Sequence, residues 1–229
     1  MANNVAVICA HPDDEVLGCG GTVARLANRG QEVHVLIVAE GVTSRDPRRD
    51  TEHRSDELNR LREAAFAAAK VLGVRTVAFG GFPDNRMDGI ELLDIVKCIE
   101  HFVVEKQIGM LLTHHAADLN VDHQIVHRAV LTACRPLPDA PVHTILSFEV
   151  PSSTEWASRG IGQQFCPTWY EDIEATLERK LQALHWYEME MRAWPHPRSY
   201  AAVEALARWR GASVGKGAAE AFELVRTIR

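Results

Sequence analysis

The sequence has no excess of basic residues and no long apolar run. Its 229 residues include 25 Lys and Arg against 31 Asp and Glu, which gives a formal net charge of −6. This balance argues against a nucleic-acid-binding module, which usually carries a basic face. A run of about 18 apolar residues, as a transmembrane helix needs, is absent. We therefore expect neither a nucleic-acid partner nor a membrane partner.

The sequence also has few features of a secreted protein. Its first residues do not show the basic and apolar regions of a signal peptide. The number of cysteines, five, is odd, and no two of them form a Cys-x-x-Cys motif. Both observations argue against a disulfide scaffold. These observations predict a soluble protein located in the cytoplasm.

Apolar segments and helix-forming segments alternate along the first 150 residues. Strands are expected at 5–10, 32–39, 74–79, 110–113 and 143–150, and helices at 17–29, 58–72, 90–106 and 121–134. This alternation is typical of βαβ units with a mainly parallel sheet covered on both faces. The sequence therefore predicts an α/β protein, a Rossmann-like three-layer α/β/α fold.

The C-terminal third has a different character, with mainly helical segments. A long helix is expected at 171–192, a second at 199–210 with Ser199 as its N-cap, and a final strand at 221–225. The sequence contains neither an internal repeat nor a low-complexity linker. Residues 1–229 are therefore expected to form a single domain.

Two segments rich in histidine and aspartate follow predicted strands. Residues 11–15 (His-Pro-Asp-Asp-Glu) come directly after the first strand, and residues 114–123 come directly after the fourth. The carboxyl ends of parallel strands share one edge of the sheet, where open α/β sheets build their sites. The two segments are therefore expected to meet in one crevice. The competing interpretation is that these residues form turns and cap the helices that follow.

Histidines and carboxylates together suit zinc, or ferrous iron in a two-histidine, one-carboxylate site. A catalytic zinc ion lowers the pKa of bound water to about 7, and a free carboxylate beside it can act as general base. Asp13 and Asp14 are adjacent, so one is expected to bind the metal and the other to act as the base. A non-enzymatic metal-binding protein is a further alternative, but the sequence offers no evident fourth ligand.

A dinucleotide-binding oxidoreductase is the alternative from another class. Gly18, Gly20 and Gly21 precede a helical segment, and Glu40 ends the second predicted strand. However, residues 11–15 separate these glycines from the first strand, where the fingerprint needs a tight turn. The glycines are instead expected to permit close packing of the helix on the sheet.

The chain resembles the PIG-L/LmbE family of zinc-dependent de-N-acetylases. The resemblance is carried by residues 10–15 with the glycines at 18–21, and by 118–123 (Asp-Leu-Asn-Val-Asp-His). Weaker similarity lies at Arg60-x-x-Glu63, 72–74 and 219–223. Nearly the whole chain is therefore similar to one LmbE-like deacetylase domain. The resemblance implies removal of the N-acetyl group from an N-acetylglucosamine-containing or related N-acylated small molecule.

The resemblance also implies roles for individual residues. His11, Asp14 and His123 would bind one zinc ion per chain, with another divalent metal as the alternative, and Asp13 would be the general base. Asp122 would support the metal site or take part in acid–base chemistry. Relatives often carry histidine where this chain has Asn120. An Asn amide can donate a hydrogen bond to an oxyanion, but it cannot serve as a general acid.

Three further residues are candidates for the site. His196, in a proline-bounded segment, is either the missing general acid or an ordinary loop residue. Arg198 either meets a substrate phosphate or carboxylate or is an ordinary loop residue, and Arg60 either binds the acyl group or pairs with Glu63 on its own helix. Members of the family often form trimers or hexamers, so a homo-oligomer is expected.

Overall fold

Five parallel strands form most of a seven-stranded sheet in the computed structural model, which describes residues 4–160 and 162–228. The order across the sheet is β3-β2-β1-β4-β5-β7-β6, with β7 antiparallel to both of its neighbours. The strands are β1 (Asn4–Cys9), β2 (Val33–Ala39), β3 (Thr76–Phe82), β4 (Ile108–His114), β5 (Thr144–Phe148), β6 (Trp169–Asp172) and β7 (Ala219–Thr227).

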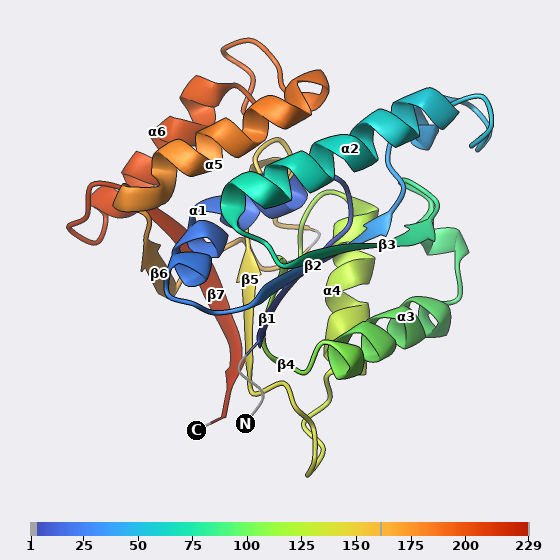
Figure 1. Cartoon of the computed structure of the whole chain (residues 1–229), viewed down its shortest axis with the longest axis horizontal. Helices are drawn as coiled ribbons and strands as arrows, with labels where there is room; N and C mark the ends of the chain where they lie inside the picture. The colour runs from blue at the N-terminus through green and yellow to red at the C-terminus, as the bar shows by residue number, and fades with distance from the viewer. Residues whose placement is uncertain (1–3, 161, 229) are drawn as a thin grey trace.

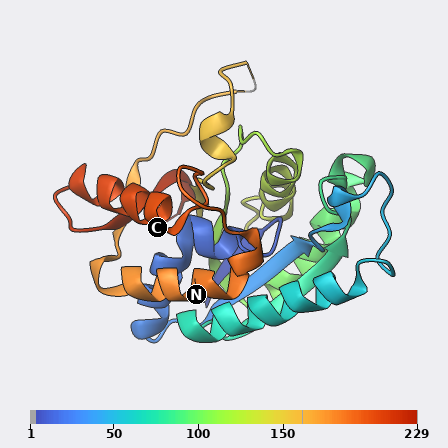
Figure 2. The same cartoon turned by 90° about the horizontal axis from the view of Figure 1, so that it is seen from above.

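Helices cover both faces of this sheet (Figure 1). Helices α1, α2 and α5 pack together on one face, and α3 and α4 pack together on the other, as the view from above also shows (Figure 2). The α-helices are α1 (Asp14–Asn28), α2 (Ser55–Leu72), α3 (Leu92–Glu105), α4 (Val121–Ala133), α5 (Leu177–Leu184) and α6 (Tyr200–Ala212). Short 3-10 helices are η1 (Thr43–Arg45), η2 (Met87–Gly89), η3 (Thr154–Trp156), η4 (Glu174–Thr176) and η5 (His185–Glu190).

Strand β1 contributes to two hydrophobic cores, one on each face of the sheet. Its successive side chains point to opposite faces of the sheet. Val5, Val7 and Cys9 lie in the core beneath α1 and α2, whereas Ala6 and Ile8 lie in the core beneath α3 and α4. A strand buried on both faces must be apolar at every position, which is the pattern the sequence shows. The predicted three-layer α/β/α architecture is confirmed.

The expected helix at 171–192 is wrong. Residues 169–172 form β6 instead, and the helical part is divided into α5 and the 3-10 helix η5. Trp169 and Tyr170 favour a strand, and β6 pairs with β7 through the whole of its length. Tertiary pairing therefore overrides the helical pattern here. The predicted N-cap at Ser199 is confirmed, since its side chain accepts a hydrogen bond from the Ala202 amide at 3.2 Å.

Helix α1 is kinked in the middle, where Cys19 has non-helical backbone angles. The Glu220 carboxylate of β7 accepts the amide hydrogens of Gly21 and Thr22 at 2.9 and 2.7 Å. It also accepts a hydrogen bond from the buried Lys180 ammonium at 2.6 Å. This contact fixes α1 between β7 and α5 and so fixes the first turn of α1, which carries the first motif.

The glycines of α1 allow this close packing. A Cβ atom at Gly18 would lie 2.3 Å from the Phe148 ring, and one at Gly21 would lie 2.7 Å from Ile173. The Glu40 carboxylate, which a dinucleotide site would need, is instead paired with Arg49 at 2.7 Å. The prediction that these glycines serve packing is therefore confirmed.

The strand order reverses between β1 and β4, which lie side by side. Open α/β sheets bind ligands at the carboxyl ends of the strands at such a point. Both histidine-rich segments therefore lie at the favoured position of the fold.

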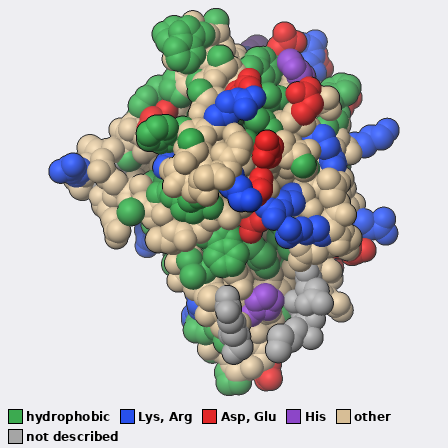
Figure 3. Space-filling model, turned by 90° about the vertical axis from the view of Figure 1, so that its left-hand side faces the viewer, with side chains coloured by type: hydrophobic (Ala, Val, Ile, Leu, Met, Phe, Trp, Pro, Cys, Tyr) green, Lys and Arg blue, Asp and Glu red, His purple; other side chains and the backbone are tan. Residues whose placement is uncertain are grey.

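Among the described residues, no helix combines the length and the apolar composition of a membrane span. On the face shown in Figure 3, basic and acidic side chains lie interspersed.

Candidate active site

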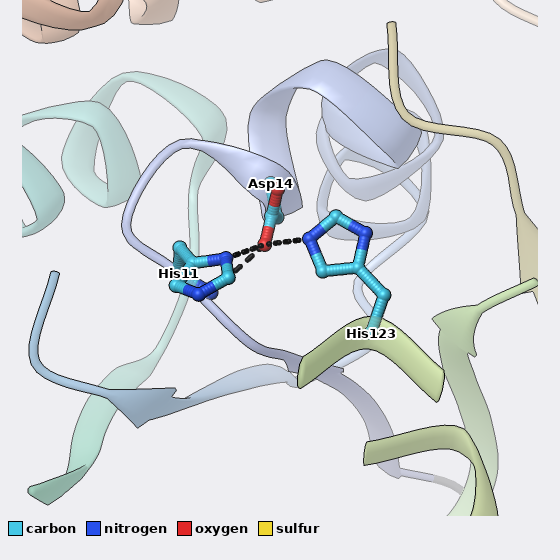
Figure 4. Close-up of side chains that lie close together, drawn as sticks. All are labelled: His11, Asp14 and His123. Carbon is cyan, nitrogen blue, oxygen red and sulfur yellow. Dashed lines mark hydrogen bonds and ion pairs between the residues drawn. The ribbon is translucent and has the colours of Figure 1, made fainter. Parts of the chain in front are cut away.

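His11, Asp14 and His123 converge at the carboxyl ends of β1 and β4 (Figure 4). One oxygen of Asp14, Oδ2, lies 3.4 Å from His11 Nδ1 and 3.3 Å from His123 Nε2. Tetrahedral zinc with ligand distances of about 2.0–2.2 Å separates two ligand atoms by about 3.3–3.6 Å. The three side chains are therefore spaced as the ligands of one metal ion would be.

Two of these side chains have buried atoms free to bind a cation. His123 Nε2 and Asp14 Oδ1 are buried and have no hydrogen-bond partner among the described residues. Such atoms are costly to bury unless something binds them. Burial lowers the pKa of His123, but the carboxylates of Asp14 and Asp118 outweigh this effect and raise its pKa to about 9. The site therefore stabilises positive charge at this point, and a divalent metal fits it.

The second ring nitrogen of His11, Nε2, contacts two carboxylates. Its Nε2 lies 3.1 Å from Asp122 Oδ2 and 3.3 Å from Asp84 Oδ1. A proton on Nε2 directed at these carboxylates leaves the Nδ1 lone pair free for a metal. Asp122 also accepts the backbone amide hydrogens of Asn85 and Met87, at 2.6 and 3.1 Å. The carboxylate of Asp122 therefore joins α4 to the segment after β3.

Asp84 is a site residue that the sequence analysis missed. It follows β3, and its own position at the carboxyl end of a parallel strand was the available signal. Its Oδ2 accepts the Ser44 amide hydrogen at 3.0 Å, so it also ties the segment after β2 to the site.

His114, the last residue of β4, stacks on His123 with ring centroids 3.8 Å apart. Its Nε2 lies 3.5 Å from Asp14, which makes it a neighbour of the predicted ligands. However, that nitrogen already accepts the Ala10 amide hydrogen at 2.8 Å. Burial, together with the nearby His123, lowers the pKa of His114 well below its usual value, so this ring is neutral. His114 therefore supports the site without a lone pair for a metal.

Asp13 lies beside the predicted ligands in a constrained backbone conformation, with φ at 109°. Its buried carboxylate receives a hydrogen bond from Arg198 Nη1 at 2.9 Å. Burial raises the pKa of Asp13 to about 8; the Arg198 charge opposes this shift, and the Asp14 charge adds to it. A carboxyl group with a pKa near neutrality can both accept and return a proton. This is the arrangement expected for a general base.

Arg198 therefore contacts the predicted base directly, where the sequence analysis expected a contact with substrate. It also lines, with His11 and Asp13, a cavity of about 150 Å³. The remaining lining is largely polar and comes from the segments after β2, β3 and β4 and from η5: Ser44, Arg45, Asp84, Asn85, Asn120 and Glu190, with Pro12, Gly41, Val42 and Leu61. Such a lining can form hydrogen bonds with a polar ligand.

Asn120 lies at this cavity and is the N-cap of α4. Its Oδ1 accepts the Asp122 amide hydrogen at 2.9 Å, and its Nδ2 donates to Asn85 Oδ1 at 2.8 Å. The side chain therefore has a structural role in addition to the oxyanion role that the resemblance implies.

Two predicted residues do not line the cavity. Arg60 lies exposed on α2, and the described residues show no ion pair between it and Glu63. His196 lies near the site, but its Nδ1 accepts the Arg198 amide hydrogen at 3.1 Å and its ring meets Trp156 edge-on. The structure therefore brings together the predicted ligands, Asp13, Asp122, Asn120 and Arg198, but neither Arg60 nor His196.

The site combines two histidines, several carboxylates and a further acidic residue, Asp13, at the point where the strand order of the sheet reverses. This arrangement defines a candidate hydrolytic metal centre. Comparison with known proteins shows a family of deacetylases. Residues 6–134 match the family described as PIG-L: GlcNAc-PI de-N-acetylase. An uncharacterized deacetylase of Escherichia coli K12, YaiS, is 31% identical over 79% of this chain and 88% of its own length. The chain belongs to the PIG-L family of deacetylases.

Solved structures share the fold. The N,N'-diacetylchitobiose deacetylase of Pyrococcus horikoshii superposes with a TM-score of 0.75 at 17% identity, over 98% of this chain and 84% of that protein. GalB of Pseudomonas putida KT2440, a 4-carboxy-2-hydroxymuconate hydratase, superposes equally well at 0.75 and 21% identity, over 99% and 98%. Since one of these proteins is a hydratase, the fold alone does not define the reaction.

Proposed function

We propose that this protein is a divalent-metal-dependent hydrolase that removes the N-acetyl group from a small N-acylated sugar or sugar conjugate. The observation that carries the proposal is the position of Asp14 Oδ2, within 3.4 Å of a nitrogen of both His11 and His123, with the Asp13 carboxylate beside it in a polar cavity. The family description and the Pyrococcus deacetylase both name N-acetylated glucosamine compounds, which supports this substrate class.

His11, Asp14 and His123 would hold the metal, with zinc as our first choice. When bound, such an ion supplies an activated water and polarises the acetyl carbonyl group. Asp13 would take a proton from the water that attacks the acetyl carbon and return it to the leaving amine nitrogen as the C–N bond breaks. We assign the proton return to Asp13 rather than to His196, because Asp13 lines the cavity and His196 does not. Arg198 orients the Asp13 carboxyl group and lowers its pKa below the value that burial alone would give.

Asn120 has a second role in this proposal. One of its amide hydrogens is donated to Asn85, and the other is available for the oxyanion that develops on the acetyl oxygen. Asp122 holds His11 in the orientation that directs Nδ1 toward Asp14. The ferrous-iron oxygenase alternative would leave the buried Asp13 without a task, so hydrolysis is the better assignment.

The test measures metal content and acetate release together. Wild type, Asp13→Asn and His123→Ala are purified, and acetate is quantified with a panel of N-acetylated sugars. We expect about one divalent ion per wild-type chain, normal metal with a 10²–10⁴-fold lower kcat in Asp13→Asn, and loss of both in His123→Ala. Asp88→Asn and His101→Ala are the matched controls, since both residues are exposed and lie outside the cavity.

Two results would contradict the proposal. One is a wild type that binds no stoichiometric divalent metal after reconstitution. The other is a metal-loaded enzyme that releases no acetate from any N-acetylated sugar but hydrates an unsaturated acid, as the structural similarity to GalB makes testable.

A further inference from the structure

The segment of residues 152–155, which follows β5, contacts both halves of the candidate site. Ser152 has a positive φ of 68°, and the Glu155 carboxylate accepts the amide hydrogens of Ser152 and Ser153 at 2.7 and 3.2 Å. These bonds close a tight turn that directs three consecutive hydroxyl groups inward.

The hydroxyl groups of Ser153 and Thr154 both donate to Asp118. The Ser153 hydroxyl bonds Oδ1, and the Thr154 hydroxyl bonds Oδ2 at 2.5 Å. All three side chains are buried. Asp118 Oδ1 also accepts the Asn120 amide hydrogen at 2.9 Å. Because these partners are donors, Asp118 is held as an acceptor and its orientation is fixed.

The fixed carboxylate faces the ring of His123. Asp118 Oδ1 lies 3.2 Å from His123 Nδ1, while Nε2 of the same ring faces Asp14 at 3.3 Å. The negative charge of a carboxylate 3.2 Å from Nδ1 favours a proton on that nitrogen and so leaves the Nε2 lone pair for a metal. The orientation of the predicted ligand thus depends on Asp118, and that of Asp118 depends on two hydroxyl groups.

Ser152 reaches the other half of the site. Its hydroxyl oxygen accepts a hydrogen bond from Arg198 Nε at 2.8 Å, and Arg198 Nη1 contacts Asp13 at 2.9 Å. Neighbouring residues of one turn therefore contact two separate chains of interactions. One leads through Asp118 to the predicted ligand, and the other leads through Arg198 to the predicted base.

We propose that Ser153 and Thr154 are positioning residues that orient His123 for metal binding through Asp118, whereas Ser152 acts on the base side only. This inference rests on the metal site proposed above. Partners behind a metal ligand commonly change metal affinity by 10–100-fold when they are removed. The proposal therefore predicts that variants of Ser153 and Thr154 lower the metal affinity, whereas a variant of the adjacent Ser152 does not.

The experiment measures the Zn²⁺ dissociation constant of the apo-protein by competition with a chromophoric chelator. Ser153→Ala and Thr154→Val are expected to weaken binding about 10–100-fold. Thr154→Ser keeps the hydroxyl group and is expected to bind as the wild type does, and so is Ser152→Ala. Thr132→Val is the matched control, because the Thr132 hydroxyl donates to the Arg128 carbonyl on its own helix, α4.

A second measurement follows the His123 ring directly. Nitrogen NMR of the apo-protein is recorded at a pH above the raised pKa of His123, where the ring is neutral. It is expected to show the Nδ1-protonated tautomer in wild type and Thr154→Ser, and a mixture of tautomers in Ser153→Ala. Thermal unfolding of the apo-proteins shows whether the variants fold normally. A purely structural role for the turn would alter unfolding but not the tautomer.

The outcomes distinguish this inference from the proposed function. Wild-type affinity in both Ser153→Ala and Thr154→Val overturns the inference and leaves the metal site intact. Equal weakening in Thr132→Val points to a general loss of packing and overturns it as well. A wild type that binds no divalent ion overturns the proposed metal site, and this inference with it.

Discussion

Arg198 Nη1 lies 2.9 Å from Asp13 Oδ2, although 185 positions separate the two residues in the sequence. The contact places a guanidinium group on the carboxylate that we propose as general base. Burial alone would keep that carboxyl group protonated at neutral pH, and the arginine charge opposes this effect. The ion pair is therefore expected to set the pH at which the enzyme becomes active.

Arg198→Ala is expected to move the acid limb of the kcat/KM profile to higher pH. Asp13 must be deprotonated to act as base, and removal of the nearby positive charge raises its pKa. An opposite charge at this distance lowers a carboxyl pKa by about 1–3 units, so kcat/KM at pH 7 should fall about tenfold or more. Arg192→Ala is the control, since within residues 4–160 and 162–228 the Arg192 side chain bonds only backbone carbonyl groups. An unchanged pH profile in Arg198→Ala would refute the assignment.

Substitutions of Asn120 should distinguish helix capping from catalysis, because its side-chain oxygen caps α4 and its amide nitrogen faces the cavity. Asn120→Asp retains a capping oxygen but loses the amide donor, whereas Asn120→Ala loses both. Both variants are expected to lower kcat by about 10²-fold, in line with the loss of an oxyanion donor. Only Asn120→Ala should also lose about 1 kcal/mol of unfolding free energy. Denaturant unfolding and acetate release measure the two effects, and wild-type kcat in Asn120→Asp would exclude the oxyanion role.

Much of this architecture could be predicted because it depends on local pattern. The continuous apolar strands and the alternating helices predict the parallel sheet, and the motifs after β1 and β4 predict where the site lies. The helix expected at 171–192 failed for a different reason. Strand β6 exists because it pairs with β7, about 50 residues later, and no local pattern contains that information.

The residues of the site likewise divide into those that the sequence could predict and those that it could not. His11, Asp14 and His123 belong to two compact motifs, so their meeting follows from the topology of the sheet. The contact between Arg198 and Asp13 depends on where the C-terminal segment returns to the sheet. The role of Asp118 could likewise not be inferred from local sequence, because its partners at 153–154 lie 35 and 36 residues away. Aspartate before a helix predicts a cap equally well.

The buried ion pair between Lys180 and Glu220 is expected to be essential for stability. Each side chain is only 4% exposed, and Glu220 also bonds two amide groups at the kink of α1. Lys180→Met leaves a buried carboxylate without its cation, which should lower the free energy of unfolding by about 3–5 kcal/mol. Lys97→Met is the control, since Lys97 pairs with Glu100 on an exposed helix face. A loss no larger than that of the control, measured by denaturant unfolding, would show that the pair is dispensable.

Gly18 should be intolerant of even one added carbon atom. Its Cβ would lie 2.3 Å from the Phe148 ring, which is fully buried and cannot move aside without disturbing the core. Gly18→Ala is therefore expected to destabilise the protein by about 1–3 kcal/mol, although alanine is the better helix former. Gly89→Ala is the matched control, because a Cβ at that position meets no atom within 4 Å. The displaced first turn of α1 should also weaken metal binding, since that turn carries Asp14. Denaturant unfolding and the Zn²⁺ dissociation constant test both effects, and a Gly18→Ala variant as stable as Gly89→Ala would contradict the close packing of α1 on the sheet.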